Sequence, residues 1–145
     1  MSNIKWLNDA FEQACMMCKN AKYAIVYTVD ERLVPAVCCA ICRTRSMANE
    51  DCDIYLIMVD TSERVEQQVI TFFDSRNLSI IIENLTGMID IDERFPRGNR
   101  FGDALYLRLY LDDLITGDYE KVLCLDADTF VERPIIDLLS TGMKG

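Results

Sequence analysis

The stretch YAIVYTVDERLVPAVCCAICRTRS, residues 23–46, decides how the chain begins to fold. Residues 23–29 are mostly aromatic or β-branched, a composition that predicts a strand. An acidic pair at 30–31 then opens a helix, which carries Pro35 in its first turn and apolar residues on most faces as far as Ser46. A strand that leads directly into a helix is the repeating unit of α/β proteins.

The same alternation continues along the rest of the chain. The further elements are a short helix at 9–19, a strand at 53–59, a helix capped by Ser62, a strand at 78–84, a helix at 101–115 and a strand at 121–126. Strands that are apolar almost throughout are typical of parallel sheets with helices on both faces. The sequence therefore predicts an α/β fold of Rossmann-like, three-layer type with a mainly parallel sheet.

Length and charge narrow the class of protein. The 145 residues suit one domain, 1–145, and 50% hydrophobic with 27% charged residues predicts a soluble globular chain. A formal net charge of −9 argues against binding to nucleic acid or anionic lipid, both of which need clustered Lys and Arg. The longest apolar run, 33–42, is about half of a membrane span, and no signal peptide is recognisable.

Seven cysteines are an odd number, and their apolar neighbours predict buried thiols in a reducing compartment, with the cytoplasm as the default. Two CxxC pairs, Cys15 with Cys18 and Cys39 with Cys42, have the spacing of a zinc ribbon. Zinc knuckles need tight turns, however, and no glycine occurs before Gly87. Helical core thiols are the preferred interpretation, and structural zinc is the alternative.

Acidic residues follow the first and the last predicted strands. Asp30 follows the first strand, and Asp126 and Asp128, separated by one alanine, end the last. In extended chain, residues two apart project to the same side, so both carboxylates can face one point. Two such carboxylates repel each other unless a cation lies between them, and Mg²⁺ or Mn²⁺ suits oxygen ligands that share the ion with a phosphate. The alternative is an ordinary turn.

Three blocks of sequence, taken in order, resemble the nucleotide-sugar half of glycosyltransferase family 8, the glycogenin-like and bacterial lipopolysaccharide galactosyltransferase group. The blocks are YAIVYTVDERLVPAV (23–37), RFGDALYLRLYLDDLI (100–115) and DYEKVLCLDADTFVERPIIDLL (118–139). The resemblance covers residues 22–140. It implies a GT-A fold and transfer of a hexose from a UDP-sugar to an acceptor hydroxyl, with retention of configuration and with Mn²⁺ (or Mg²⁺) as cofactor. The acceptor, whether glycan, lipid-linked sugar or protein, is not implied.

The resemblance also assigns site residues by position. Asp126 and Asp128 would hold the metal, which bridges the diphosphate of the donor. Asp30 would lie at the uracil or ribose, and Arg108 would lie near the sugar and diphosphate, although a solvated helix position is its plain alternative. The full set of donor-binding positions is Thr28, Val29, Asp30, Arg32, Arg108, Asp126, Ala127 and Asp128.

One part of the family pattern is not found in this sequence. The family's third metal ligand is a histidine in a C-terminal HxxGxxKPW-like segment, and the acceptor site lies in the same later half. The chain has no histidine and ends about twenty residues after the DAD triplet, so we expect either a fragment of a longer enzyme or a naturally short relative. A non-catalytic nucleotide-sugar-binding module is one alternative, and a flavodoxin-like or receiver-type signalling domain is the other.

Overall fold

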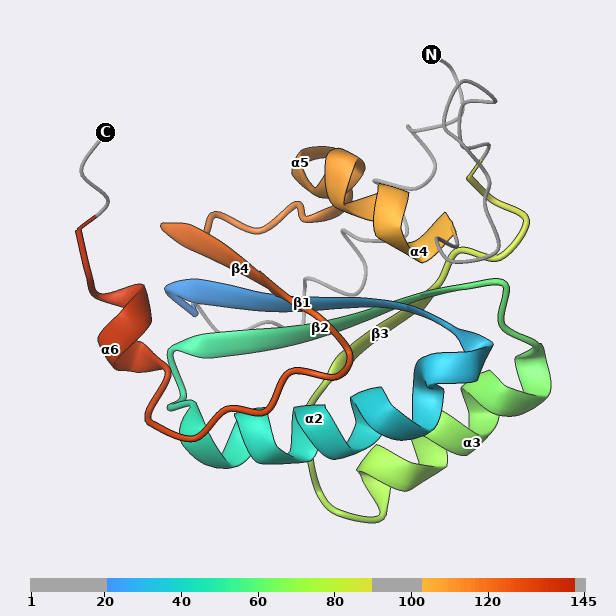
Figure 1. Cartoon of the computed structure of the whole chain (residues 1–145), viewed down its shortest axis with the longest axis horizontal. Coiled ribbons are helices and arrows are strands. Elements are labelled where there is room, and N and C mark those ends of the chain that lie inside the picture. The colour runs from blue at the N-terminus through green and yellow to red at the C-terminus, as the bar shows by residue number, and fades with distance from the viewer. Residues whose placement is uncertain (1–20, 90–102, 143–145) are drawn as a thin grey trace.

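The computed structural model describes residues 21–89 and 103–142, and a four-stranded parallel sheet lies at its centre (Figure 1). The strands are β1 (Tyr23–Asp30), β2 (Cys52–Val59), β3 (Ile81–Asn84) and β4 (Lys121–Leu125). Their order across the sheet is β3-β2-β1-β4. The predicted strands are confirmed, although β3 begins three residues later than expected. The helix predicted at 9–19 lies outside the described residues.

Helices cover both faces of the sheet, as expected of a three-layer fold (Figure 1). On one face lie α2 (Val34–Met47), entered through the short 3₁₀ helix η1 (Glu31–Leu33), and α3 (Glu63–Asp74). On the other lie α4 (Asp103–Tyr106), the 3₁₀ helix η2 (Leu107–Tyr110) and α5 (Leu111–Leu114). A last short helix, α6 (Ile136–Leu139), follows β4.

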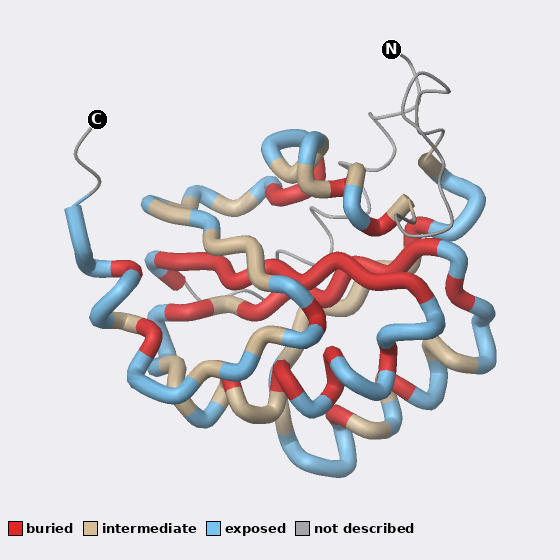
Figure 2. Tube along the Cα trace, in the orientation of Figure 1, coloured by how far each residue is buried: buried red, intermediate tan, exposed pale blue. Residues whose placement is uncertain are grey.

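Strand β1 is buried along its whole length, because it pairs with β2 on one side and β4 on the other (Figure 2). Its side chains alternate between two apolar clusters. Ile25 and Tyr27 belong to the cluster under α2 and α3, whereas Ala24 and Val26 belong to the cluster under α4 and η2. This two-sided burial explains why the strand lacks the polar alternation of a half-exposed sheet.

A buried hydroxyl pair ties β1 to α2. The Tyr27 hydroxyl lies 2.6 Å from Thr44 Oγ1, and neither residue is exposed to solvent. Burial raises the pKa of Tyr27, so the phenol stays protonated and hydrogen bonded. Each hydroxyl is thereby satisfied in a region where an unpaired polar group would be costly.

The helix predicted at 101–115 is not one regular helix in its described part. Residues 107–110 form a 3₁₀ turn between two single α-turns. Residues three apart eclipse one another in a 3₁₀ helix. The tighter winding therefore places Ala104, Leu107 and Tyr110 against the same apolar cluster of the sheet. The sequence pattern predicted helix correctly but not its change of winding.

The cysteines are not all core thiols. Cys38 and Cys52 are buried, but Cys39 points from α2 to solvent, so the prediction of a core position is wrong for that residue. Its place on the outer face of the helix follows from its position beside the inward-facing Cys38. Cys15 and Cys18 lie outside the described residues, so the zinc alternative stays untested by the fold.

In the described ranges, 21–89 and 103–142, none of the helices combines the length and the apolar character needed to cross a bilayer.

We expect Thr44→Val to lower the free energy of unfolding by about 1–3 kcal/mol, because it strands the Tyr27 hydroxyl without a partner. Adding Tyr27→Phe to that variant should recover most of the loss, since both polar partners are then absent. Urea unfolding followed by circular dichroism measures both variants. A double variant less stable than Thr44→Val alone would contradict the assigned pair.

Candidate functional site at the switch point of the sheet

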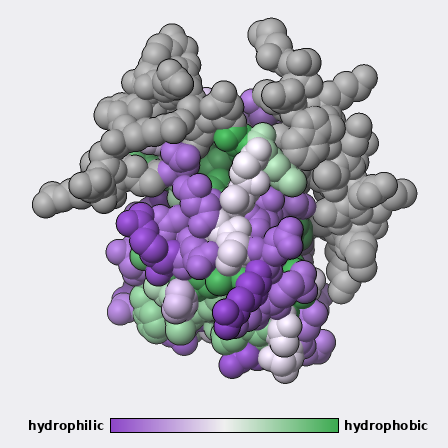
Figure 3. All heavy atoms as spheres, turned by 90° about the vertical axis from the view of Figure 1, so that its right-hand side faces the viewer, coloured by the Kyte–Doolittle hydropathy of each residue, from purple (hydrophilic) through white to green (hydrophobic). Residues whose placement is uncertain are grey.

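The carboxyl ends of β1 and β4 lie side by side where the strand order reverses. From β1 the chain continues to β2 and β3 on one side of the sheet, and β4 is added on the other side. Tyr27 pairs with Leu125 in the last matched position, so Asp30 and the DAD triplet follow at neighbouring strand ends. Ligands of open α/β sheets bind at such a switch point. Among the described residues that are visible from this side, hydrophilic ones predominate, with some hydrophobic patches between them (Figure 3).

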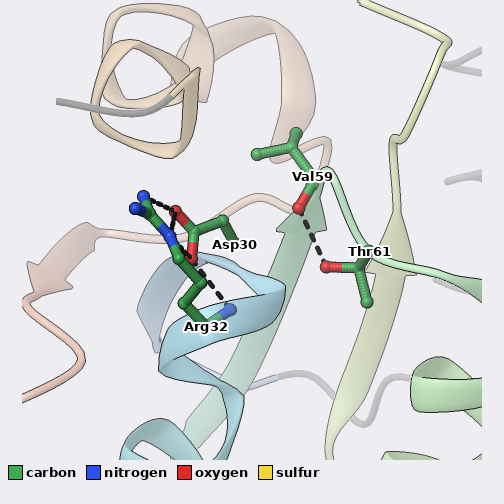
Figure 4. A network of polar contacts seen from close by, with 4 residues as sticks. All are labelled: Asp30, Arg32, Val59 and Thr61. Atoms are coloured by element: carbon green, nitrogen blue, oxygen red, sulfur yellow. Dashed lines mark hydrogen bonds and ion pairs between the residues drawn. The ribbon is translucent and has the colours of Figure 1, made fainter. Parts of the chain in front are cut away.

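Asp30 forms a compact pair with Arg32. Its side chain accepts the Arg32 backbone N–H at 3.0 Å, which caps η1, and it receives the Arg32 guanidinium Nη2 at 2.6 Å (Figure 4). These hydrogen bonds and the positive charge lower the pKa of Asp30, although burial opposes the shift. Asp30 is 7% exposed, whereas the Arg32 side chain lies largely in solvent. The Arg32 guanidinium therefore occupies much of the hydrogen-bonding capacity of the Asp30 carboxylate.

Thr28 and Val29, the two residues before Asp30, point to opposite faces of the sheet. Val29 is fully buried among the residues under α2, so none of its atoms is exposed to a ligand in the structure. Thr28 has a buried Oγ1 atom with no hydrogen-bond partner in the part of the chain that the structure describes. A buried polar atom without a partner is uncommon and marks a position that a ligand or water can satisfy.

The end of β2 is closed differently from the ends of β1 and β4. Asp60 has a positive φ of 46°, a conformation that aspartate tolerates better than most residues. The following Thr61 is buried, and its hydroxyl donates to the Val59 carbonyl at 2.8 Å (Figure 4). The side chain of Thr61 is therefore used to close the turn.

The DAD triplet forms a turn in which the alanine is buried and both aspartates are exposed. Ala127 packs into the cluster under α2, while Asp126 and Asp128 face solvent. The Thr129 amide donates to the Asp126 carbonyl at 2.9 Å and closes the turn. The prediction of an extended chain at the triplet is therefore wrong, because these residues form a turn. Both carboxylates lie on the outside of the turn because the small Ala127 side chain between them is buried.

Arg108 lies on η2, on the face of the sheet opposite α2, and its side chain contacts Asp126 of the triplet. Its guanidinium Nη2 forms an ion pair and hydrogen bond with Asp126 Oδ1, which raises the pKa of Arg108. The Arg108 side chain is 33% exposed, and its Nε atom is buried without a partner among the described residues. Arg108 is therefore a partly buried, ion-paired residue, and its place near the sugar and diphosphate stays a prediction. A surface ion pair of this kind contributes about 0–1 kcal/mol, so it can be exchanged for a ligand.

The residues at this edge offer a partial donor set for a divalent metal. Two exposed carboxylates on one turn suit a hard ion that takes oxygen ligands. Within residues 21–89 and 103–142, no three His, Cys, Asp or Glu side chains gather closely enough to hold a metal by themselves. Asp126 and Asp128 thus fit an ion that fills its other positions from phosphate and water.

Sequence reasoning did not find one set of contacts behind the triplet. Arg43 of α2 donates from Nε to the Val131 carbonyl at 2.9 Å, and its guanidinium lies 5.3 Å from the centre of the Phe130 ring. The two partners are 88 positions apart along the chain. An arginine on an amphipathic helix has no local signal that predicts such a contact, so only the tertiary structure reveals it.

Comparison with known sequences and structures agrees on the fold. The sequence profile described as Glycosyl transferase family 8 matches residues 17–145. No curated protein sequence is significantly similar to the chain. Three similar structures are the galactosyltransferase LgtC in complex with donor and acceptor sugar analogs, the WbbM bifunctional glycosyltransferase, and the glycosyltransferase GlyE of Streptococcus pneumoniae TIGR4.

These similarities cover most of this chain but less than half of each of the larger proteins. LgtC has 20% identity and a TM-score of 0.62, over 83% of this chain and 43% of LgtC. WbbM has 18% identity and a TM-score of 0.61, over 88% of this chain and 22% of WbbM. GlyE has 23% identity and a TM-score of 0.55, over 86% of this chain and 28% of GlyE. The chain therefore spans less than half the length of each of these structures.

The α/β layers, the parallel sheet and the structural matches identify a GT-A-type fold that corresponds to part of these glycosyltransferases. The family profile covers nearly the whole chain. The chain belongs to glycosyl transferase family 8.

Proposed function

We propose that this chain forms the donor-binding part of a metal-dependent, retaining hexosyltransferase and that it binds a UDP-sugar across the ends of β1 and β4. The observation that carries the proposal is the meeting of Asp30, Arg108 and the DAD triplet at the switch point of the sheet. Family membership supports glycosyl transfer as the reaction class. Because the chain belongs to this family, we no longer consider a flavodoxin-like or receiver-type signalling domain.

In this proposal the nucleoside lies at the end of β1. Asp30 is ionised and can accept hydrogen bonds from the uracil or ribose once Arg32 moves aside. Thr28 and Val29 line the same strand end, and the unpartnered Thr28 hydroxyl supplies a further polar contact. Arg32 is largely exposed, so moving its guanidinium into solvent requires no rearrangement of the core.

The diphosphate lies at the end of β4 in this proposal. Asp126 and Asp128 would hold Mn²⁺ or Mg²⁺, with Ala127 as the buried support between them. The ion, when bound, neutralises the negative charge that develops on the departing UDP. Arg108 is the counter-ion of Asp126 in the structure, and a guanidinium also matches phosphate oxygens in a two-pronged geometry. We therefore propose that Arg108 pairs with Asp126 when no ligand is bound and with the diphosphate when the donor is bound.

A non-catalytic nucleotide-sugar-binding module is the second candidate. The 145 residues contain no histidine that could join Asp126 and Asp128 as a metal ligand. The two candidates share the donor site and differ only in transfer of the sugar. Release of free hexose from UDP-glucose or UDP-galactose in Mn²⁺, or its transfer to an added acceptor, supports the enzyme; binding of UDP-sugar without turnover supports the module.

Asp128→Asn should weaken Mn²⁺-dependent binding of UDP by about tenfold, which corresponds to about 1.4 kcal/mol. The substitution preserves the shape of the side chain but removes a charged metal ligand. Titration calorimetry with UDP, with and without Mn²⁺, measures the effect, and Asp137→Asn at the start of α6 is the matched control. If Asp128→Asn bound UDP in Mn²⁺ as tightly as the parent, the DAD triplet would be only a turn.

Arg108→Gln should change two affinities in opposite directions. Binding of Mn²⁺ alone should strengthen, because the guanidinium no longer competes for Asp126. Binding of UDP-glucose should weaken, because the diphosphate loses a cationic partner, while uridine should be unaffected. The exposed Arg64 of α3 offers the control substitution Arg64→Gln. Parallel weakening of Mn²⁺ and UDP-glucose binding would argue against an exchange of partners by Arg108.

Asp30→Asn should weaken the binding of uridine and UDP by the same factor, whether or not Mn²⁺ is present. The amide retains an oxygen that can cap η1, so the fold should survive, but the negative charge that attracts ligand donors is lost. Calorimetric titrations of both ligands in the presence and absence of Mn²⁺ test this expectation. A loss confined to the Mn²⁺ titrations would place Asp30 at the metal instead of the nucleoside.

A further inference from the structure

We propose that Arg43 on α2 is a positioning residue that holds the DAD turn in the orientation needed for metal-dependent donor binding. The role rests on the proposed function, because it acts on Asp126 and Asp128. Arg43 lies on α2, which follows β1, whereas the DAD triplet follows β4. Arg43 acts on the triplet through the chain that leaves it.

Two contacts join Arg43 to the residues immediately after the turn. Its Nε atom donates to the Val131 carbonyl oxygen at 2.9 Å. The guanidinium carbon lies 5.3 Å from the centre of the Phe130 ring, within the range of a cation–π interaction. A hydrogen bond and a ring contact from one planar group fix both the position and the direction of this short segment.

Few other contacts hold this part of the chain. Before it, Ala127 is buried and the Thr129 amide closes the turn on Asp126. After it, the Ile135 amide donates to the Met47 carbonyl at 3.0 Å. Between these points, the N–H groups of residues 130–133 donate no backbone hydrogen bond within the part of the chain that the structure describes, and Pro134 has no N–H to donate. Val131 packs in part against the apolar cluster under α2, and Arg43 adds a side-chain hydrogen bond from α2 to the middle of this connection.

The exposure of Phe130 agrees with a tether of this kind. The residue is 66% exposed, so its ring is not held by burial in the apolar core. Its contact with Arg43 therefore depends on a cation that α2 presents at the right place. Loss of that cation would free Phe130 and leave Val131 held by its packing against the apolar cluster under α2, and the adjoining turn would gain freedom at its carboxyl end.

Metal binding is sensitive to such freedom. Two carboxylates on one short turn must point to a common position for an ion to share them. Groups that orient metal ligands without touching the metal typically change its affinity by about 10–100-fold when they are removed. The nucleoside end of the site belongs to β1, which pairs with β2 along its whole length and with β4 as far as Tyr27, and it should not respond to Arg43.

The experiment compares Arg43→Gln with Arg45→Gln in the full chain. Arg45 is the matched control because it also lies on α2 and also donates to backbone carbonyls, those of Cys52 and Asn49, but away from the triplet. Three quantities are measured: Mn²⁺ affinity in the presence of UDP, uridine affinity without metal, and the hydrogen exchange rate of the Thr129 amide by NMR. If Arg43→Gln does not fold, Arg43→Lys replaces it, because it keeps the charge but loses the planar fork.

We expect Arg43→Gln to lose about tenfold in Mn²⁺ affinity, with uridine affinity unchanged and with faster exchange at Thr129. Arg45→Gln should leave all three quantities unchanged. Unaltered exchange at Thr129 in folded Arg43→Gln, or equal changes in both variants, would overturn the proposal. If the parent bound neither Mn²⁺ nor UDP, the proposed function would fail, and the exchange rate of Thr129 would still decide whether Arg43 holds the turn.

Discussion

The burial of β1 between β2 and β4 is the constraint on which the rest of the structure depends. A strand that is paired with neighbours and covered on both faces cannot carry charged side chains along its length. The one charged residue of β1, Asp30, therefore lies at its carboxyl end, where it caps the entry to the next helix. Because β4 is added beside β1, a second polar strand end must lie next to the first.

Two arginines at this edge of the sheet explain how an acidic protein could bind a negatively charged donor. The net charge of −9 disfavours anions in general, yet Asp30 pairs with Arg32 and Asp126 pairs with Arg108. Each arginine satisfies an acid in the structure and is partly or largely accessible to solvent. The same guanidinium groups supply local positive charge to a diphosphate, while the carboxylates become free for a metal and a nucleoside in the proposed function. Exchange of ion-pair partners is favourable only because surface pairs are weak.

The sequence predicted the features that arise from local pattern. Apolar strands alternating with helices indicated the parallel sheet, and acidic residues at strand ends indicated where polar groups would gather. Family resemblance directed attention to Arg108 as a donor-binding residue, which stays a prediction; the structure shows its ion pair with Asp126, which the sequence did not predict. The winding of η2 could not be predicted, because it depends on which side chains the sheet accepts.

Other features lacked a local signal for a different reason. The turn of the DAD triplet depends on burial of Ala127 against α2, which no neighbouring residue encodes. The contact of Arg43 with Val131 joins positions 88 residues apart, and an arginine on an exposed helix is usually a solvated residue. Long-range polar contacts of this type are specified by the packed structure as a whole.

The most direct test of the account is where a paramagnetic ion binds. In the NMR spectrum of the isotope-labelled chain with UDP, substoichiometric Mn²⁺ should broaden the amide signals of residues 126–129 most strongly and those of 28–30 next, since both strand ends border one site. Amides of α3 should stay sharp. Strong broadening elsewhere, with residues 126–129 unaffected, would contradict a shared metal and nucleotide site at the ends of β1 and β4.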